Sequence, residues 1–103
     1  MKFDHVAIQT DDIAESVKWY TNHFDCEILY HDETWAMLNV CGMQLALVMP
    51  NQHPPHIAFC ISEETARAEY SNKKFKLHRD GTKSFYQRDN QNNIIEIIVR
   101  PND

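Results

Sequence analysis

The segment Asn93-Ile94-Ile95-Glu96-Ile97-Ile98-Val99 places one carboxylate in the middle of an apolar run. Such a run is typical of a buried strand, and an ionised Glu inside it is costly unless it meets a cation, a metal or water. Two other apolar stretches each begin with an imidazole, from His5 and from His56. Any one of these residues alone is explained by the polar face of an edge strand. Together, His and Glu side chains converging from three strands predict a divalent-metal site.

Length and composition restrict the class of protein. The chain has 103 residues and a net charge of −5, without a run of Lys or Arg. It therefore suits one domain (1–103) that binds neither nucleic acid nor anionic membranes. No apolar run approaches the roughly 20 residues of a membrane span, and no leader peptide opens the chain. The three cysteines lack CxxC spacing, so we expect a cytoplasmic protein with reduced thiols in or near the core, at Cys26, Cys41 and Cys60.

The order of elements follows from apolar periodicity and turn residues. In the first half we expect strands at about 3–9, 26–31, 34–40 and 43–49. A helix capped by Asp12 lies between the first two, with a core face of Ile13, Val17, Tyr20 and Phe24. In the second half we expect a strand at 56–61, a helix after Ser62, a hairpin of 76–79 with 82–88 around Asp80-Gly81, and a last strand after a turn at 89–92. The buried face of the second helix comprises Ala66, Tyr70 and Phe75.

The two halves are copies of each other. At a constant offset of 51 residues, His5 corresponds to His56 and Ala7 to Ala58. The predicted fold is therefore α+β, with two tandem βαβββ modules at about 1–50 and 55–103 and a boundary within Met49–Pro55. One helix covers one face of each sheet. We expect the sheets to form a cup with the helices on its convex face, and His5, His56 and Glu96 to meet on the concave face.

Four motifs in this order resemble those of the vicinal oxygen chelate superfamily, which includes glyoxalase I, bleomycin-resistance proteins, extradiol dioxygenases and methylmalonyl-CoA epimerase. They are Asp4-His5-Val6-Ala7-Ile8, Ser16-Val17-Lys18-Trp19-Tyr20, His56-Ile57-Ala58-Phe59 and Asp89-Asn90-Gln91-Asn92-Asn93-Ile94-Ile95-Glu96-Ile97. The resemblance covers essentially the whole chain. Asn92 replaces a family glycine, which is tolerable because Asn accepts left-handed backbone. The chain is also shorter than typical members, which leaves the substrate open.

The resemblance implies a cup that holds one divalent metal, with ligands from the first and fourth strands of each module. Here these ligands are His5, Gln44, His56 and Glu96, and the metal is Ni, Co, Mn, Zn or Fe. Gln44 would share its face with Ala46 and Val48. One difficulty is that the offset of 51 places Glu96 on Leu45. A one-residue change of register would remove it, since a slip of one reverses the face.

The resemblance further implies a glyoxalase-like lyase, isomerase or epimerase that chelates neighbouring oxygens of a small substrate, with Glu96 moving a proton. Glu33 and His31 are alternative bases, although an exposed turn explains both. A thiol transferase of the fosfomycin-resistance kind, with three ligands, and a metal-free binding protein of the bleomycin-resistance kind stay open. An extradiol dioxygenase is less favoured. We expect a homodimer, because neither module alone encloses a cup.

Overall fold

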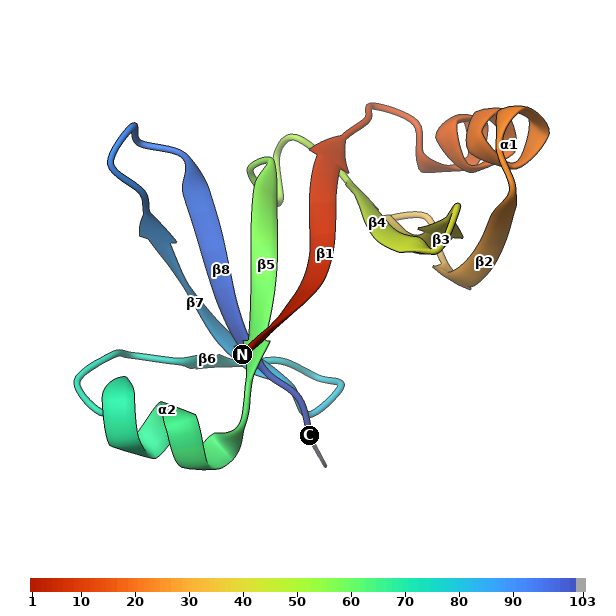
Figure 1. The fold of residues 1–103 in the computed structure, drawn as a ribbon. Coiled ribbons are helices and arrows are strands. Elements are labelled where there is room, and N and C mark those ends of the chain that lie inside the picture. Colours follow the sequence, from red (N-terminus) through yellow and green to blue (C-terminus); the bar gives the residue numbers. More distant parts are fainter. Residues whose placement is uncertain (102–103) are drawn as a thin grey trace. The chain divides into compact units, whose positions relative to one another are not determined.

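The computed structural model describes residues 1–101. Along the chain, a strand, a helix and three strands occur twice, which confirms the predicted α+β fold of two βαβββ modules (Figure 1). The elements are β1 (Lys2–Gln9), α1 (Ile13–His23), β2 (Cys26–His31), β3 (Trp35–Val40), β4 (Met43–Val48), β5 (His56–Ile61), α2 (Glu63–Glu69), β6 (Lys76–Leu77), β7 (Lys83–Arg88) and β8 (Ile94–Val99). Neither of these helices is long and apolar enough to span a membrane.

The chain divides into two compact units, each with one of the two helices. The N-terminal unit is the continuous segment His5–His56, and the C-terminal unit combines Met1–Asp4 with the chain from Ile57 onward. Strand β1 thus begins in one unit and continues in the other, and β5 leaves the N-terminal unit after its first residue. Each unit is described below by itself.

In the N-terminal unit, the strands lie in the order β2-β3-β4-β1, with β1 parallel to β4 and the other pairs antiparallel. Side chains alternate between the two faces of a strand. One face packs Ala36, Leu38 and Leu47 against Ile13 and Val17 of α1. The opposite face carries a separate cluster of Ala7, Met37, Ala46 and Val48, with Trp35 beside it.

The ends of α1 explain one wrong prediction. The helix begins as expected, with the Asp12 side chain accepting a hydrogen bond from the Glu15 backbone N–H. It ends at His23, so Phe24 adopts extended backbone and is 45% exposed instead of continuing the core face. Its ring contacts those of Trp19 and Tyr20, of which Tyr20 packs against the core as predicted and Trp19 is 49% exposed. Helical spacing predicted a buried Phe24 only because it assumed one more turn.

In the C-terminal unit, the strands lie in the order β5-β8-β7-β6, with β5 parallel to β8. Ala66 of α2 packs on Ile61, Ile97 and Val99. The helix ends before Tyr70, so Phe75 joins this core from the following loop, not from the helix. Asp4 and Arg100 form a two-point ion pair, with Nε to Oδ1 at 2.9 Å and Nη2 to Oδ2 at 2.7 Å.

Two turns have left-handed backbone at residues other than glycine. Asn92 has φ +72°, as expected where it replaces the family glycine. Cys41 has φ +53° in the tight turn between β3 and β4, and its side chain is exposed. The prediction of near-core thiols is therefore wrong for Cys41, whereas Cys60 is buried and Cys26 is half-buried. A turn residue with positive φ lies outside the strand alternation on which that prediction depended.

Candidate metal centre

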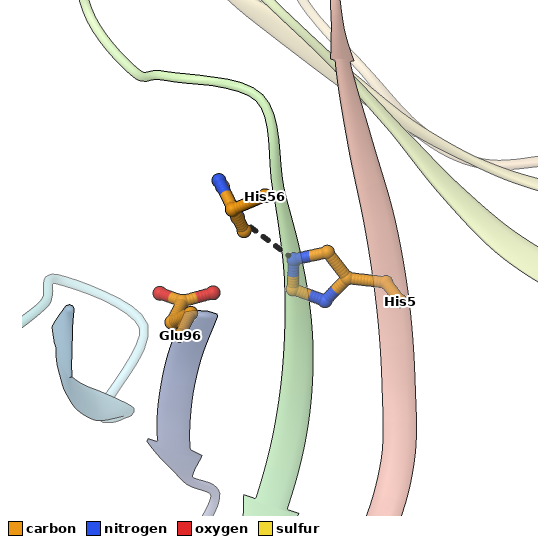
Figure 2. Close-up of side chains that lie close together, drawn as sticks. All are labelled: His5, His56 and Glu96. Atoms are coloured by element: carbon orange, nitrogen blue, oxygen red, sulfur yellow. Dashed lines mark hydrogen bonds between the residues drawn. The ribbon is translucent and has the colours of Figure 1, made fainter. Parts of the chain in front are cut away.

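The N-terminal unit brings the two predicted histidine ligands together. His5 on β1 and His56 at the start of β5 are 6% and 8% exposed. Their Nε2 atoms lie 3.4 Å apart, and the rings meet edge to face at a centroid distance of 5.5 Å (Figure 2). Two imidazoles separated by 51 residues therefore point their distal nitrogens at a common place.

A backbone carbonyl orients His56. Its Nδ1 lies 2.8 Å from the carbonyl oxygen of Pro54. A carbonyl oxygen only accepts, so Nδ1 carries the hydrogen and donates it. In the neutral ring, Nε2 is then the unprotonated nitrogen, which is the form that binds a metal cation. This is the arrangement found around metal-ligating histidines, where a hydrogen bond to the other nitrogen selects the tautomer. The Pro54-Pro55 segment therefore joins the two halves of the chain and also orients the His56 ring.

Gln44 lies beside His5 on the neighbouring strand. In the β1–β4 register Val6 is opposite Leu45, so the preceding residue, His5, is opposite Gln44 and on the same face. The cluster of Ala7, Ala46 and Val48 occupies that face, away from α1. The face predicted for Gln44 is therefore the one observed, and Gln44 is half-buried there.

Glu96 lies on β8 in the C-terminal unit and is 8% exposed. It is opposite Ala58 on β5 and Tyr86 on β7. The neighbouring residues Ile95 and Ile97 pack toward α2, so Glu96 is on the other face. His56 precedes Ala58 by two residues on one strand and therefore shares the face of Glu96.

The strand registers explain how Glu96 can face away from the helix although the offset of 51 aligns it with Leu45. Ala7 pairs with Ala46, but its counterpart Ala58 pairs with Glu96 and not, as an offset of 51 requires, with Ile97. The second module is thus shifted by one residue, which puts Glu96 on the face away from the helix. The position equivalent to Glu96 is consequently Ala46. Gln44 is two residues away on the same face, so the two modules do not contribute equivalent fourth-strand residues.

Tyr86 on β7 lies opposite Glu96. Although Tyr86 is 42% exposed, the burial of the rest of its side chain and the negative charge of neighbouring Glu96 raise the pKa of Tyr86 to about 12. Its hydroxyl therefore stays protonated at neutral pH and can donate a hydrogen bond. In the sequence, the pairing of Tyr86 with Glu96 was indicated only by the predicted hairpin around Asp80-Gly81 and the strand that follows it.

The alternative bases lie in an exposed turn. His31 and Glu33 are both exposed on either side of Asp32. The Asp32 carboxylate accepts hydrogen bonds from the Tyr30 hydroxyl and from the backbone N–H groups of Thr34 and Trp35, and these lower its pKa. This supports the simpler interpretation of a structured hairpin turn.

The same turn fixes an aromatic pair. Tyr30 stacks on Trp35 with ring centroids 4.6 Å apart. Tyr30 is opposite Met37, and Trp35 packs on the Met37 cluster, so both rings are on the face that carries His5. We call Tyr30 and Trp35 the aromatic wall.

The sequence matches a known protein family over nearly its whole length. The model of the Glyoxalase/Bleomycin resistance protein/Dioxygenase superfamily matches residues 2–96, and the chain belongs to this superfamily. None of the curated proteins is significantly similar to it in sequence.

Solved structures share the fold at low sequence identity. Methylmalonyl-CoA epimerase from Mycobacterium tuberculosis is 17% identical, with a TM-score of 0.75 over 97% of this chain and 88% of that one. A variant of the Streptomyces coelicolor methylmalonyl-CoA epimerase is 16% identical, with a TM-score of 0.72 over 99% of this chain and 96% of that one. An NAD-dependent benzaldehyde dehydrogenase from Legionella pneumophila is 17% identical, with a TM-score of 0.69 over 93% and 97%. Proteins named for different activities thus share this fold, so activity has to be argued from the site.

Proposed function

We propose that this protein is a metal-dependent enzyme of the lyase, isomerase or epimerase type, which binds two neighbouring oxygens of a small substrate. The observation that supports it best is the buried imidazole pair of His5 and His56, with the His56 tautomer selected by Pro54. In this proposal Glu96 is the anionic ligand and Gln44 the fourth.

The donor set fits a divalent cation. Zinc–imidazole bonds of about 2.0–2.1 Å at a tetrahedral angle place two nitrogens about 3.3 Å apart, and the observed separation is 3.4 Å. Glu96, on β8 of the C-terminal unit, is the carboxylate that this proposal adds to the imidazole pair. Two neutral imidazoles and one carboxylate suit Ni, Co, Mn, Zn and Fe alike.

The proposed chemistry divides into distinct tasks. A bound cation would supply Lewis acidity toward a substrate carbonyl or hydroxyl pair. Glu96 is the group that we expect to accept and return the proton, because it is the carboxylate of the proposed ligand set. Tyr86 keeps its proton at neutral pH and can donate a hydrogen bond beside it. The aromatic wall offers apolar contact for the rest of the substrate.

The structurally similar epimerases suggest a class of substrate to test. A His, Gln, His and Glu ligand set is the one that the family resemblance assigns to methylmalonyl-CoA epimerases. We therefore propose 2-substituted acyl thioesters as the first substrates to test and hemithioacetals as the second. The homodimer and the cytoplasmic location stay predictions.

Metal binding of single variants tests this proposal. Protein prepared with chelator and titrated with Ni²⁺, Co²⁺ or Zn²⁺ should bind one ion per chain, and His56→Ala should abolish tight binding. Glu96→Gln should weaken binding more than Gln44→Ala, because it removes the only charged ligand. His31→Ala is the matched control, since His31 is exposed, and it should bind like wild type.

A second measurement separates a catalytic from a structural metal. A catalytic centre keeps a position open, whereas a structural one is closed by four protein ligands. The Co²⁺ protein should therefore change its visible spectrum on adding acetohydroxamate. Wild-type affinity in His56→Ala would contradict the ligand assignment. A spectrum unaffected by hydroxamate, with no turnover of either substrate class, would contradict the proposal that the protein is an enzyme.

A further inference from the structure

Cys41 occupies a turn position that cysteine seldom takes. The two-residue turn Cys41-Gly42 joins β3 to β4, and both residues have positive φ, +53° and +90°. Two-residue turns of this kind favour Asn-Gly, Asp-Gly or Gly-Gly, because few side chains tolerate left-handed backbone. An exposed thiol is therefore held where the backbone prefers another residue.

The hairpin of β2 and β3 places Cys41 next to Cys26. Cys26 is opposite Val40, and the Cys41 backbone N–H donates to the Asp25 carbonyl at 2.8 Å, so the antiparallel pairing continues for one step beyond the strands. A diagonal neighbour one residue along an adjacent antiparallel strand has a Cα separation of about 6 Å. Disulfides span Cα separations of about 4.4–6.8 Å.

The left-handed backbone also decides which way the Cys41 thiol points. In a regular strand Cys41 would face away from Val40 and Cys26. Rotating φ from about −120° in a strand to +53° turns the Cα–Cβ bond to the other side of the preceding peptide plane. The side chain of Cys41 is thereby directed to the face of Cys26, which packs beside the α1 core. Burial and the neighbouring Cys41 and Asp25 raise the pKa of Cys26.

We propose that Cys26 and Cys41 form a redox-active dithiol that small disulfides such as oxidised glutathione convert to an internal disulfide. The exposed Cys41 thiolate attacks a sulfur of the small disulfide, forms a mixed disulfide and releases one thiolate. The Cys26 thiolate then attacks the Cys41 sulfur and releases the second. The protein gives up two electrons and two protons, and one small disulfide becomes two thiols.

Each cysteine has a role that follows from its surroundings. Cys41 reacts first because it is exposed and because a raised pKa leaves Cys26 with less thiolate at neutral pH. Cys26 resolves the mixed disulfide because it lies beside Cys41. Cys60 is buried on β5 and takes no part, which makes it the matched control.

The test uses the folded, full-length Cys60→Ser protein. Incubation with oxidised glutathione should remove two hydrogen atoms from its intact mass, and a reductant should restore them. Cleavage after Glu27 and Glu33 places Cys26 and Cys41 in separate peptides, which should stay joined until reduction. Replacing Cys26 by Ser as well should trap a stable glutathione adduct on Cys41.

Three results would overturn the proposal. One is a lasting glutathione adduct on Cys60→Ser instead of the internal disulfide. Another is a disulfide between two chains under non-reducing electrophoresis. The third is equal formation of the internal disulfide when Cys41 is replaced by Ser in the otherwise wild-type chain, because Cys60 would then be the partner.

Discussion

Replacing Arg100 by Met should strongly destabilise the C-terminal unit. Arg100 makes two hydrogen bonds to Asp4, whose side chain is 7% exposed, whereas that of Arg100 is 32% exposed. Breaking a buried ion pair costs about 3–5 kcal/mol, and an exposed pair contributes about 0–1 kcal/mol. With a buried carboxylate and a guanidinium one-third exposed, we expect a loss of about 2–3 kcal/mol. For a chain of this size the Tm should fall by about 10–20 °C.

Urea denaturation followed by circular dichroism measures this loss. Arg88→Met is the matched control, because Arg88 is exposed and its guanidinium donates to the Asn92 carbonyl; it should cost about 0.5 kcal/mol or less. Asp4→Asn combined with Arg100→Met should be less unstable than the sum of the single variants, because the buried charge disappears with its partner. A loss under about 0.5 kcal/mol for Arg100→Met, or strict additivity, would refute the reasoning.

Two further predictions concern Tyr86 and Asn92. Ultraviolet titration should show one tyrosine ionising at a pKa of about 12, absent in Tyr86→Phe and lowered in Glu96→Gln. Because the folded state holds this proton more tightly, its stabilising effect is present below pH of about 10 and is lost as pH rises toward the folded pKa. A normal pKa would contradict the partial burial of Tyr86 beside Glu96. Asn92, with φ +72°, should lose about 1 kcal/mol on replacement by Ala and little on replacement by Gly. Equal stabilities of these two variants in urea would show that the turn is not left-handed.

Much of the fold was predictable because its signals are local. Alternation along 93–99 and helical spacing of Ile13 and Val17 depend only on neighbouring residues, and the observed elements follow them. Phe24 and Cys41 were misjudged because a helix end and a left-handed turn interrupt that periodicity. The position of Gln44 relative to Glu96 depends on a one-residue register shift between modules, which turn lengths determine and side-chain patterns do not reveal.

The candidate site was predictable in residue type more than in arrangement. His5, His56 and Glu96 were visible as polar residues in apolar strands. The Pro54 carbonyl that selects the His56 tautomer and the placement of Tyr86 opposite Glu96 result from backbone geometry and strand pairing. Neither the Pro54 contact nor the Tyr86 pairing can be predicted from composition or from the spacing of residues.

The ion pair between Asp4 and Arg100 also bears on how the protein is made. Its partners are separated by 96 residues, so the loop closed by this contact includes almost the entire chain. The N-terminal unit is one continuous segment and can fold while the ribosome is still adding residues. Residues 1–4 are made before the N-terminal unit but belong to the unit that is completed after it. They therefore have to stay available for pairing with Arg100 until β8 has left the ribosome.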